Sequence, residues 1–146
     1  MNRIRVAFAF GLCALLTASP AGARTTFHDL SVQTARDSEV GKTKLRKVPF
    51  YMAGQKHPGV AKDFGVFTAN RRTNAFGKSD EAACQIAFLS AVIALQARAE
   101  KLGGNAVVDV KSITKHNNLT SASEYRCAAG NVVANVVLTG RVVKLK

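Results

Sequence analysis

The chain has 146 residues, of which 47% are hydrophobic, and its 21 basic and nine acidic residues give a formal net charge of +12. This length corresponds to one domain with a real core, and the composition excludes a low-complexity chain. The basic excess predicts attraction to anionic surfaces such as lipid head groups, cell-wall polymers, lipopolysaccharide or nucleic acid; the alternative is that the charge only keeps the protein soluble.

The N-terminal segment has the pattern of a secretory signal peptide. Two arginines precede an apolar run, Val6–Ala18, and small residues at 21–23 precede Arg24. The run is shorter than the roughly 20 apolar residues of a membrane-spanning helix. We expect a cleaved signal peptide at 1–23 and a single domain at 24–146 with no transmembrane segment. The product is then a periplasmic or secreted bacterial protein whose net charge, after loss of two arginines, is +10.

The first half of the domain contains short candidate elements. Residues 26–32 are compatible with an edge strand and 32–40 with a short helical turn. Apolar and polar residues alternate from Lys44 to Ala53, which predicts a strand. Pro49 places that strand at a sheet edge, because proline cannot donate a ladder hydrogen bond. Residues 64–70 form a further strand candidate.

The clearest predicted element is a long helix. Ser79 is a good N-cap, and acidic residues follow it in the first turn. From Ala82 to Leu102 there is no glycine or proline, and Gly103-Gly104 favours termination. Apolar residues cover most of its circumference, which predicts packing across a sheet. A narrow polar face is expected from Gln85, Gln96, Arg98, Glu100 and Lys101.

Two strands are predicted after the helix. The first covers Asn105–Ile113, with Val108 and Val110 on one face, and the second covers Gly130–Lys146. Gly140 indicates a bulge or bend in the second strand. The polar segment Thr114–Arg126 is expected to lie outside the core as a loop. The predicted fold class is therefore α+β, a small, mainly antiparallel sheet of four or five strands covered by one long helix.

Cys84 and Cys127 are the two cysteines outside the predicted signal peptide. Two cysteines in an oxidising compartment predict one disulfide, which would stabilise the fold by about 4 kcal/mol at most. A shared metal ion is the alternative. Neither cysteine lies in a CxxC or CxxH motif, so the spacing favours the disulfide.

Two tripeptides resemble the end of a phosphate-binding loop, Gly41-Lys42-Thr43 and Gly77-Lys78-Ser79. Such a loop also needs a glycine five positions before its Gly-Lys pair, so that backbone N–H groups can surround the phosphates. Arg36 and Arg72 occupy those positions. We therefore interpret the second tripeptide as the start of a helix and expect no bound nucleotide.

No set of residues indicates catalysis. His28, His57 and His116 share no metal-ligand spacing, and Ser90 lacks the glycine elbow of a nucleophilic serine. No pair of carboxylates is spaced for acid–base chemistry. Nucleic-acid binding also lacks the interleaved aromatic residues of a stacking platform. We expect no catalytic residue, no metal site and no cofactor.

Basic residues cluster in two places, which we take as candidate sites for binding an anion or a partner. The first cluster is Lys42, Lys44, Arg46 and Lys47, and the second is Arg71, Arg72 and Lys78.

Three segments resemble a known family: 74–81 (Asn-Ala-Phe-Gly-Lys-Ser-Asp-Glu), 99–110 around Leu-Gly-Gly-Asn-Ala-Val-Val, and 127–130 (Cys-Ala-Ala-Gly). They are similar to short exported bacterial proteins often labelled excinuclease ATPase subunit. That label implies recognition of DNA damage with ATP hydrolysis and zinc modules. The chain departs from this pattern because it has neither a complete nucleotide loop nor the cysteines of a zinc site.

A more distant resemblance rests on the helix-to-strand junction at 102–108 and the final strands. These are similar to the YbjQ-like domain and to the Rcs-pathway outer-membrane sensor lipoprotein. The resemblance implies a disulfide-stabilised envelope module that binds partner proteins. The chain departs from the sensor in having one possible disulfide and no lipid-attachment cysteine.

Together these observations predict a non-enzymatic periplasmic or envelope module that binds a protein partner or an anionic envelope polymer. The alternatives are a DNA-repair-type nucleotide-binding protein, as the family label implies, and a basic nucleic-acid-binding protein.

Overall fold

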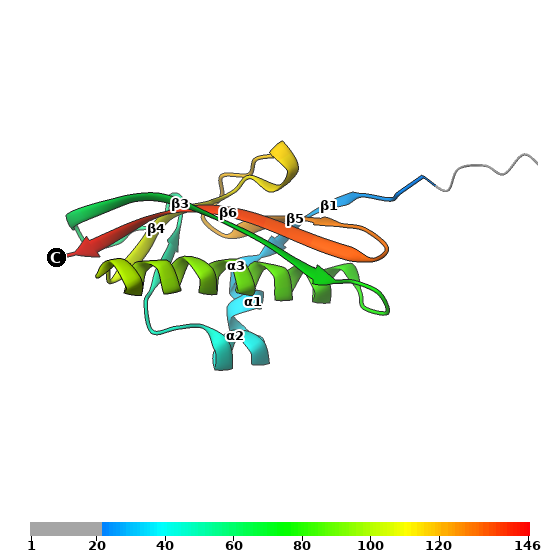
Figure 1. Ribbon diagram of the computed structural model, residues 1–146, viewed down its shortest axis with the longest axis horizontal. Coiled ribbons are helices and arrows are strands. Elements are labelled where there is room, and N and C mark those ends of the chain that lie inside the picture. The colour runs from blue at the N-terminus through cyan, green and yellow to red at the C-terminus, as the bar shows by residue number, and fades with distance from the viewer. Residues whose placement is uncertain (1–21) are drawn as a thin grey trace, which may run out of the picture.

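The computed structural model describes residues 22–146 and has the predicted α+β fold. One long helix, α3 (Asp80–Leu102), lies across one face of a six-stranded, mostly antiparallel sheet (Figure 1). The predicted signal peptide falls almost wholly outside the described residues. The remaining elements are β1 (Thr26–Ser31), α1 (Val32–Asp37), α2 (Glu39–Lys44), β2 (Phe50–Met52), β3 (Val60–Asn74), β4 (Ala106–Ser112), a 3₁₀ turn (Thr114–His116), β5 (Glu124–Ala129) and β6 (Val133–Leu145).

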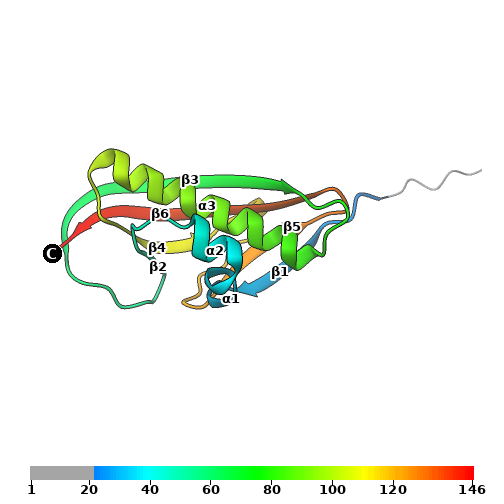
Figure 2. The ribbon, with the colours of Figure 1, turned by 90° about the horizontal axis from the view of Figure 1, so that it is seen from below.

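Strand β6 is the centre of the sheet. It pairs with β3 along one side, and on its other side with β5 and β4. The strand order is β1-β5-β6-β4-β2, with β3 paired to β6 outside this path (Figure 2). All the pairings are antiparallel except β2 with β4. Strands β1 and β2 lie at the two ends of the order, as predicted for 26–32 and for the segment containing Pro49.

Helix α3 begins and ends where the sequence predicts. The Ser79 hydroxyl accepts a hydrogen bond from the backbone N–H of Ala82 at 3.1 Å, and Gly103 adopts the left-handed conformation with φ of 80°. The helix is long and apolar enough to cross a membrane, but over half of its most apolar stretch is buried in the protein. It is the core helix of this fold.

Two features bring α3 close to the sheet. Phe88 stacks on Tyr125 of β5 with ring centroids 3.9 Å apart. At Gly140 of β6, a Cβ atom would lie 2.7 Å from Cγ1 of Val107 and 3.2 Å from Cδ1 of Leu95. Because such contacts are too short, a side chain there would push the helix and the strands apart. Gly140 also faces a bulge on β4, rather than forming one in its own strand.

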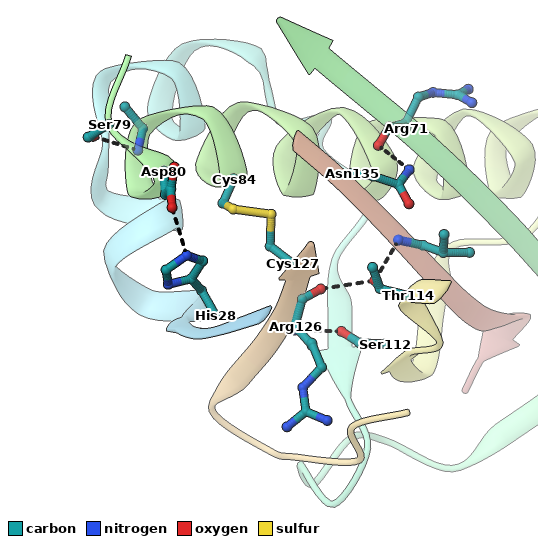
Figure 3. The surroundings of a disulfide bond; sticks show 12 residues. His28, Arg71, Ser79, Asp80, Cys84, Ser112, Thr114, Arg126, Cys127 and Asn135 are labelled. Carbon is teal, nitrogen blue, oxygen red and sulfur yellow. Dashed lines mark hydrogen bonds and ion pairs between the residues drawn. A yellow bond between two sulfur atoms is a disulfide. The ribbon is translucent and has the colours of Figure 1, made fainter. Parts of the chain in front are cut away.

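The disulfide predicted between Cys84 and Cys127 is present. It joins the first turns of α3 to β5, with the two Cα atoms 5.7 Å apart (Figure 3). Both cysteines are fully buried. Disulfides persist in oxidising compartments, so this bond is consistent with a location outside the cytoplasm.

The prediction of a strand over Lys44–Ala53 is wrong for its first half. Helix α2 extends to Lys44, and only Phe50–Met52 pairs with the sheet. The intervening segment is held by Gln96 of α3. The Gln96 side chain accepts a hydrogen bond from the N–H of Arg46 at 3.0 Å and donates to the carbonyl of Val48 at 2.6 Å. Gln96, predicted to be on the polar face of the helix, is therefore buried.

Two predictions about the C-terminal half also need correction. Asp109, with φ of 53°, lies in a bulge of β4, so Val107 and Val110 face α3 while Val108 packs in a small cluster with Val143. Val108 and Val110 therefore do not share a face. The segment Thr114–Arg126 is not wholly outside the core, since β5 begins within it and both Thr114 and Tyr125 are buried. The extra strand gives six strands instead of four or five.

Candidate functional site

A polar seam fixes the segment after β4 to the face of the sheet opposite α3, which we call the open face (Figures 1 and 3). Strands β5 and β6 pair at only two positions and then separate. The Thr114 hydroxyl bridges the gap, donating to the carbonyl of Arg126 and accepting from the N–H of Val137, both at 3.0 Å. The Ser112 hydroxyl accepts from the N–H of Arg126 at 2.9 Å. Because these buried groups satisfy one another, the start of the segment is rigidly placed.

The Arg126 side chain links the segment after β4 to strand β1. Its guanidinium donates to both carboxylate oxygens of Asp29 at 2.7 Å, and also to the side chain of Asn117 and the carbonyl of Asn118. The hydrogen bond from Arg126 holds the pKa of Asp29 below its ordinary value, and the same bond raises the pKa of Arg126. The charge of Arg126 is therefore compensated within the protein.

Between this segment and the sheet lies a hollow of about 470 Å³. A smaller hollow of about 220 Å³ shares Arg72, Lys115 and Asn135 with it. We call the larger one the basic hollow; it is lined by Asn70, Arg72, Ile113, Lys115, His116, Asn118, Asn135 and Val137.

The backbone is strained at two of the basic residues that line the basic hollow. Lys115 and His116 have φ of 48° and 60°, in the left-handed region that disfavours residues with a Cβ atom. This conformation costs roughly 1–2 kcal/mol for each residue. Paired backbone hydrogen bonds between Ser112 and Leu119 close the loop and hold it in this conformation. Such outliers concentrate at functional sites, where the fold supports them.

The charge of the basic hollow is not compensated by the rest of the protein. Among residues 22–146, neither Arg72 nor Lys115 nor His116 forms an ion pair. The floor of the hollow is fixed, because the buried amide of Asn135 donates to Oδ1 of Asn70 at 2.6 Å and to the carbonyl of Arg71 at 3.1 Å. A preformed concave surface with two cations and amide groups is suited to binding an anion.

The structure separates the predicted cluster of Arg71, Arg72 and Lys78. Successive residues of a strand face opposite sides of the sheet, so Arg72 reaches the basic hollow and Arg71 lies on the side of α3. The Arg71 guanidinium donates to the carbonyl of Asn70 at 3.0 Å, and the Lys78 ammonium to that of Asn74 at 3.2 Å. Arg72 alone belongs to the hollow.

The other predicted cluster lies on the side of α3. Lys42 and Lys44 belong to α2, and Arg46 and Lys47 follow it (Figure 2). Arg46 forms an ion pair with Glu100 at 2.6 Å, so part of this charge is compensated. The cluster is therefore not part of the basic hollow.

Arg46 also lines a third hollow, of about 580 Å³, together with Arg36 and Phe50. The Arg36 guanidinium lies 3.9 Å from the centre of the Phe50 ring and donates to the Phe50 carbonyl at 2.8 Å. Burial lowers the pKa of Arg36. Its Nε atom is buried and has no hydrogen-bond partner in the described part of the chain, so an anion cannot reach it without movement of the side chain.

Sequence reasoning missed Lys115 and His116. They occur singly in a polar segment, and their position over Arg72 depends on contacts with β5 and β6. Within residues 22–146, no group of three metal-ligating side chains is close enough to hold a metal ion. The tripeptide Gly77-Lys78-Ser79 forms the turn and N-cap before α3.

Comparison with protein-family models, curated proteins and solved structures gave no match. The resemblance to the exported proteins labelled as excinuclease subunits, and to the envelope sensor, therefore stays a prediction.

Proposed function

We propose that this protein is an exported, non-enzymatic binding module whose basic hollow binds the anionic groups of an envelope polymer. The observation that carries this proposal is the uncompensated charge of Arg72 and Lys115 around a preformed hollow. Phosphate and carboxylate groups are the envelope anions that fit these donors. An arginine guanidinium can bind either group through two parallel hydrogen bonds, and a lysine adds a point charge.

A polymer fits this surface better than a single small anion. Arg72 and Lys115 line both hollows on the open face, so successive anionic groups of one chain can occupy neighbouring positions. Asn70 and Asn118 offer amide groups to the hydroxyls of a glycan. Because the cations are exposed, the affinity is expected to fall as salt is added.

Export is the second part of the proposal. The signal-peptide pattern and the buried disulfide both support it. We expect the periplasmic or secreted form to begin at Arg24, which intact mass measurement of the fractionated protein tests. A cytoplasmic product that retains Met1 would contradict the proposed location and would favour the alternative of a nucleotide-binding protein.

Binding to dextran sulfate, with uncharged dextran as the reference, tests the hollow. The variant with Arg72→Gln and Lys115→Gln loses two charges in the hollow, and Lys42→Gln with Lys44→Gln loses two on α2. We expect the first pair to weaken binding about tenfold or more, because hydrogen bonds to charged groups are lost. The second pair should change affinity by about threefold or less, as expected for exposed charges. Equal losses for both pairs would contradict a defined site.

A further inference from the structure

Strand β3 leaves one side unpaired over its length. It has 15 residues and pairs with β6, and within residues 22–146 no strand pairs with its other side. Figure 2 shows β3 along the margin of the sheet, beside α3. A long unpaired edge offers backbone donors and acceptors to an added strand, and proteins usually block such edges.

Hydrogen bonds that flank the pairing identify which backbone groups face outward. Ala75, just after β3, donates its N–H to the carbonyl of Val132, just before β6. In an antiparallel pair every second residue bonds to the partner strand, so the odd-numbered residues of β3 from 67 to 73 bond to β6. The pattern on β6 is consistent with this assignment. Ile113 donates its N–H to the carbonyl of Val137, so the backbone groups of Val137 face away from β3. Val137 lies opposite Asn70, an even-numbered residue of β3. Even-numbered residues from 66 to 74 consequently direct their N–H and C=O groups to the free edge.

Two cationic side chains occupy part of that edge. The carbonyls that accept from Arg71 and Lys78 are those of Asn70 and Asn74, both even-numbered. Val66, also on the edge, is 56% exposed. The edge is thus blocked by two exposed cationic side chains, rather than by a proline. Carboxylates of a partner would compete with the two carbonyls for these cations.

A hollow of about 220 Å³ lies beside the edge, between β3 and α3, and is lined by Phe67, Thr68, Arg71 and Arg98 among others. The Arg98 guanidinium is 5.2 Å from the centre of the Phe67 ring. Neither arginine forms an ion pair within the described residues, and the lining contains no carboxylate. The hollow therefore has room and charge for an acidic side chain.

We propose that the free edge of β3 binds an extended, acidic segment of a partner protein, which adds a strand to the sheet and places a carboxylate between Arg71 and Arg98. This mode of recognition combines backbone hydrogen bonds with side-chain pockets. A second copy of the chain is a poor occupant, because the formal net charge is +12 for the whole sequence and +10 without residues 1–23, so the pairing would bring like charges together. The proposal is independent of the basic hollow.

Amide hydrogen exchange, followed by NMR, tests the proposal residue by residue. The probe is a ten-residue peptide in which valine alternates with glutamate, and the control replaces every glutamate by lysine. In the free protein, amides of 67, 69 and 71 should be protected and those of 66, 68, 70 and 72 should exchange rapidly. The glutamate peptide should protect the second set, and the lysine peptide should not.

Two variants separate the backbone and charge contributions. Thr68→Pro removes an outward N–H that β6 does not use, and Thr68→Val keeps that donor as the matched control. Arg71→Gln with Arg98→Gln removes the charge beside the hollow without a change in the backbone. We expect the proline and the double variant each to weaken peptide binding about tenfold, with Thr68→Val near the parent protein.

Four results would overturn the proposal. They are absence of binding by the glutamate peptide, equal binding by the lysine peptide, binding without protection of the even-numbered amides, and protection of those amides by self-association without peptide. A loss of polymer binding with Arg72 and Lys115 replaced leaves this test unaffected, since neither side chain lines the hollow beside α3.

Discussion

Replacing both Cys84 and Cys127 with alanine should destabilise the protein by about 4 kcal/mol. The bond closes a loop with a sequence separation of 43 residues. In the chain-entropy model, this closure lowers the entropy of the unfolded chain by about 13 cal/mol/K, which is about 4 kcal/mol at 25 °C. The lost sulfur atoms add a small packing cost, because Cys84 of α3 and Cys127 of β5 are both fully buried.

Urea unfolding of the oxidised protein, the reduced protein and the double alanine variant measures this effect. The reduced protein keeps both sulfur atoms, so its difference from the oxidised form isolates the constraint on the unfolded chain. We expect the reduced protein and the variant to lie within about 1 kcal/mol of each other and well below the oxidised form. A total loss below about 1 kcal/mol would refute the reasoning, as would two free thiols in the natively isolated protein.

The other predictions concern two polar contacts that fix the surroundings of the sites. Gln96→Leu should lower the unfolding free energy by about 1–3 kcal/mol, because backbone groups of Arg46 and Val48 lose their partner; Gln85→Leu, measured alongside by urea unfolding, should cost less. Asp29→Asn should destabilise the protein at neutral pH. Since the pKa of Asp29 is lowered in the folded state, its contribution is present above the unfolded pKa and is lost as the pH falls below about 4. The parent and the Asn variant should therefore converge in stability in acid, and a constant difference down to pH 2 would contradict this role of the carboxylate.

Local signals sufficed for the elements whose limits are encoded nearby in the chain. Ser79 and Gly103 define α3 because capping depends on the residue itself and its immediate neighbours. The two cysteines sufficed for the disulfide because no other cysteine lies outside the predicted signal peptide.

Features that depend on distant contacts were missed. Strand β5 alternates polar Glu124 and Arg126 with buried residues, as a strand does, but the alternation covers only a few residues at the end of a polar segment. Its pairing partner, β1, lies far earlier in the chain, so the sequence near β5 does not reveal the pairing. The residues next to Gln96 in the sequence do not indicate that it is buried, because its hydrogen-bond partners, the backbone groups of Arg46 and Val48, lie about 50 residues earlier.

The candidate site divides in the same way. Arg72 was recognised from charge alone. Its separation from Arg71 requires the strand assignment, and its association with Lys115 requires the position of the segment over the open face. The basic residues Arg71 and Arg72, which are adjacent in the sequence, therefore lie on opposite faces of the sheet.

The central claim, that the basic hollow is the site of polyanion binding, is tested most directly by following backbone amide resonances as dextran sulfate is added to the purified protein. The account predicts that the largest, saturable shifts occur at Arg72, Lys115, His116 and Asn135, and that they diminish as salt is added. Shifts concentrated on α2 (Glu39–Lys44), with the hollow unchanged, would contradict it.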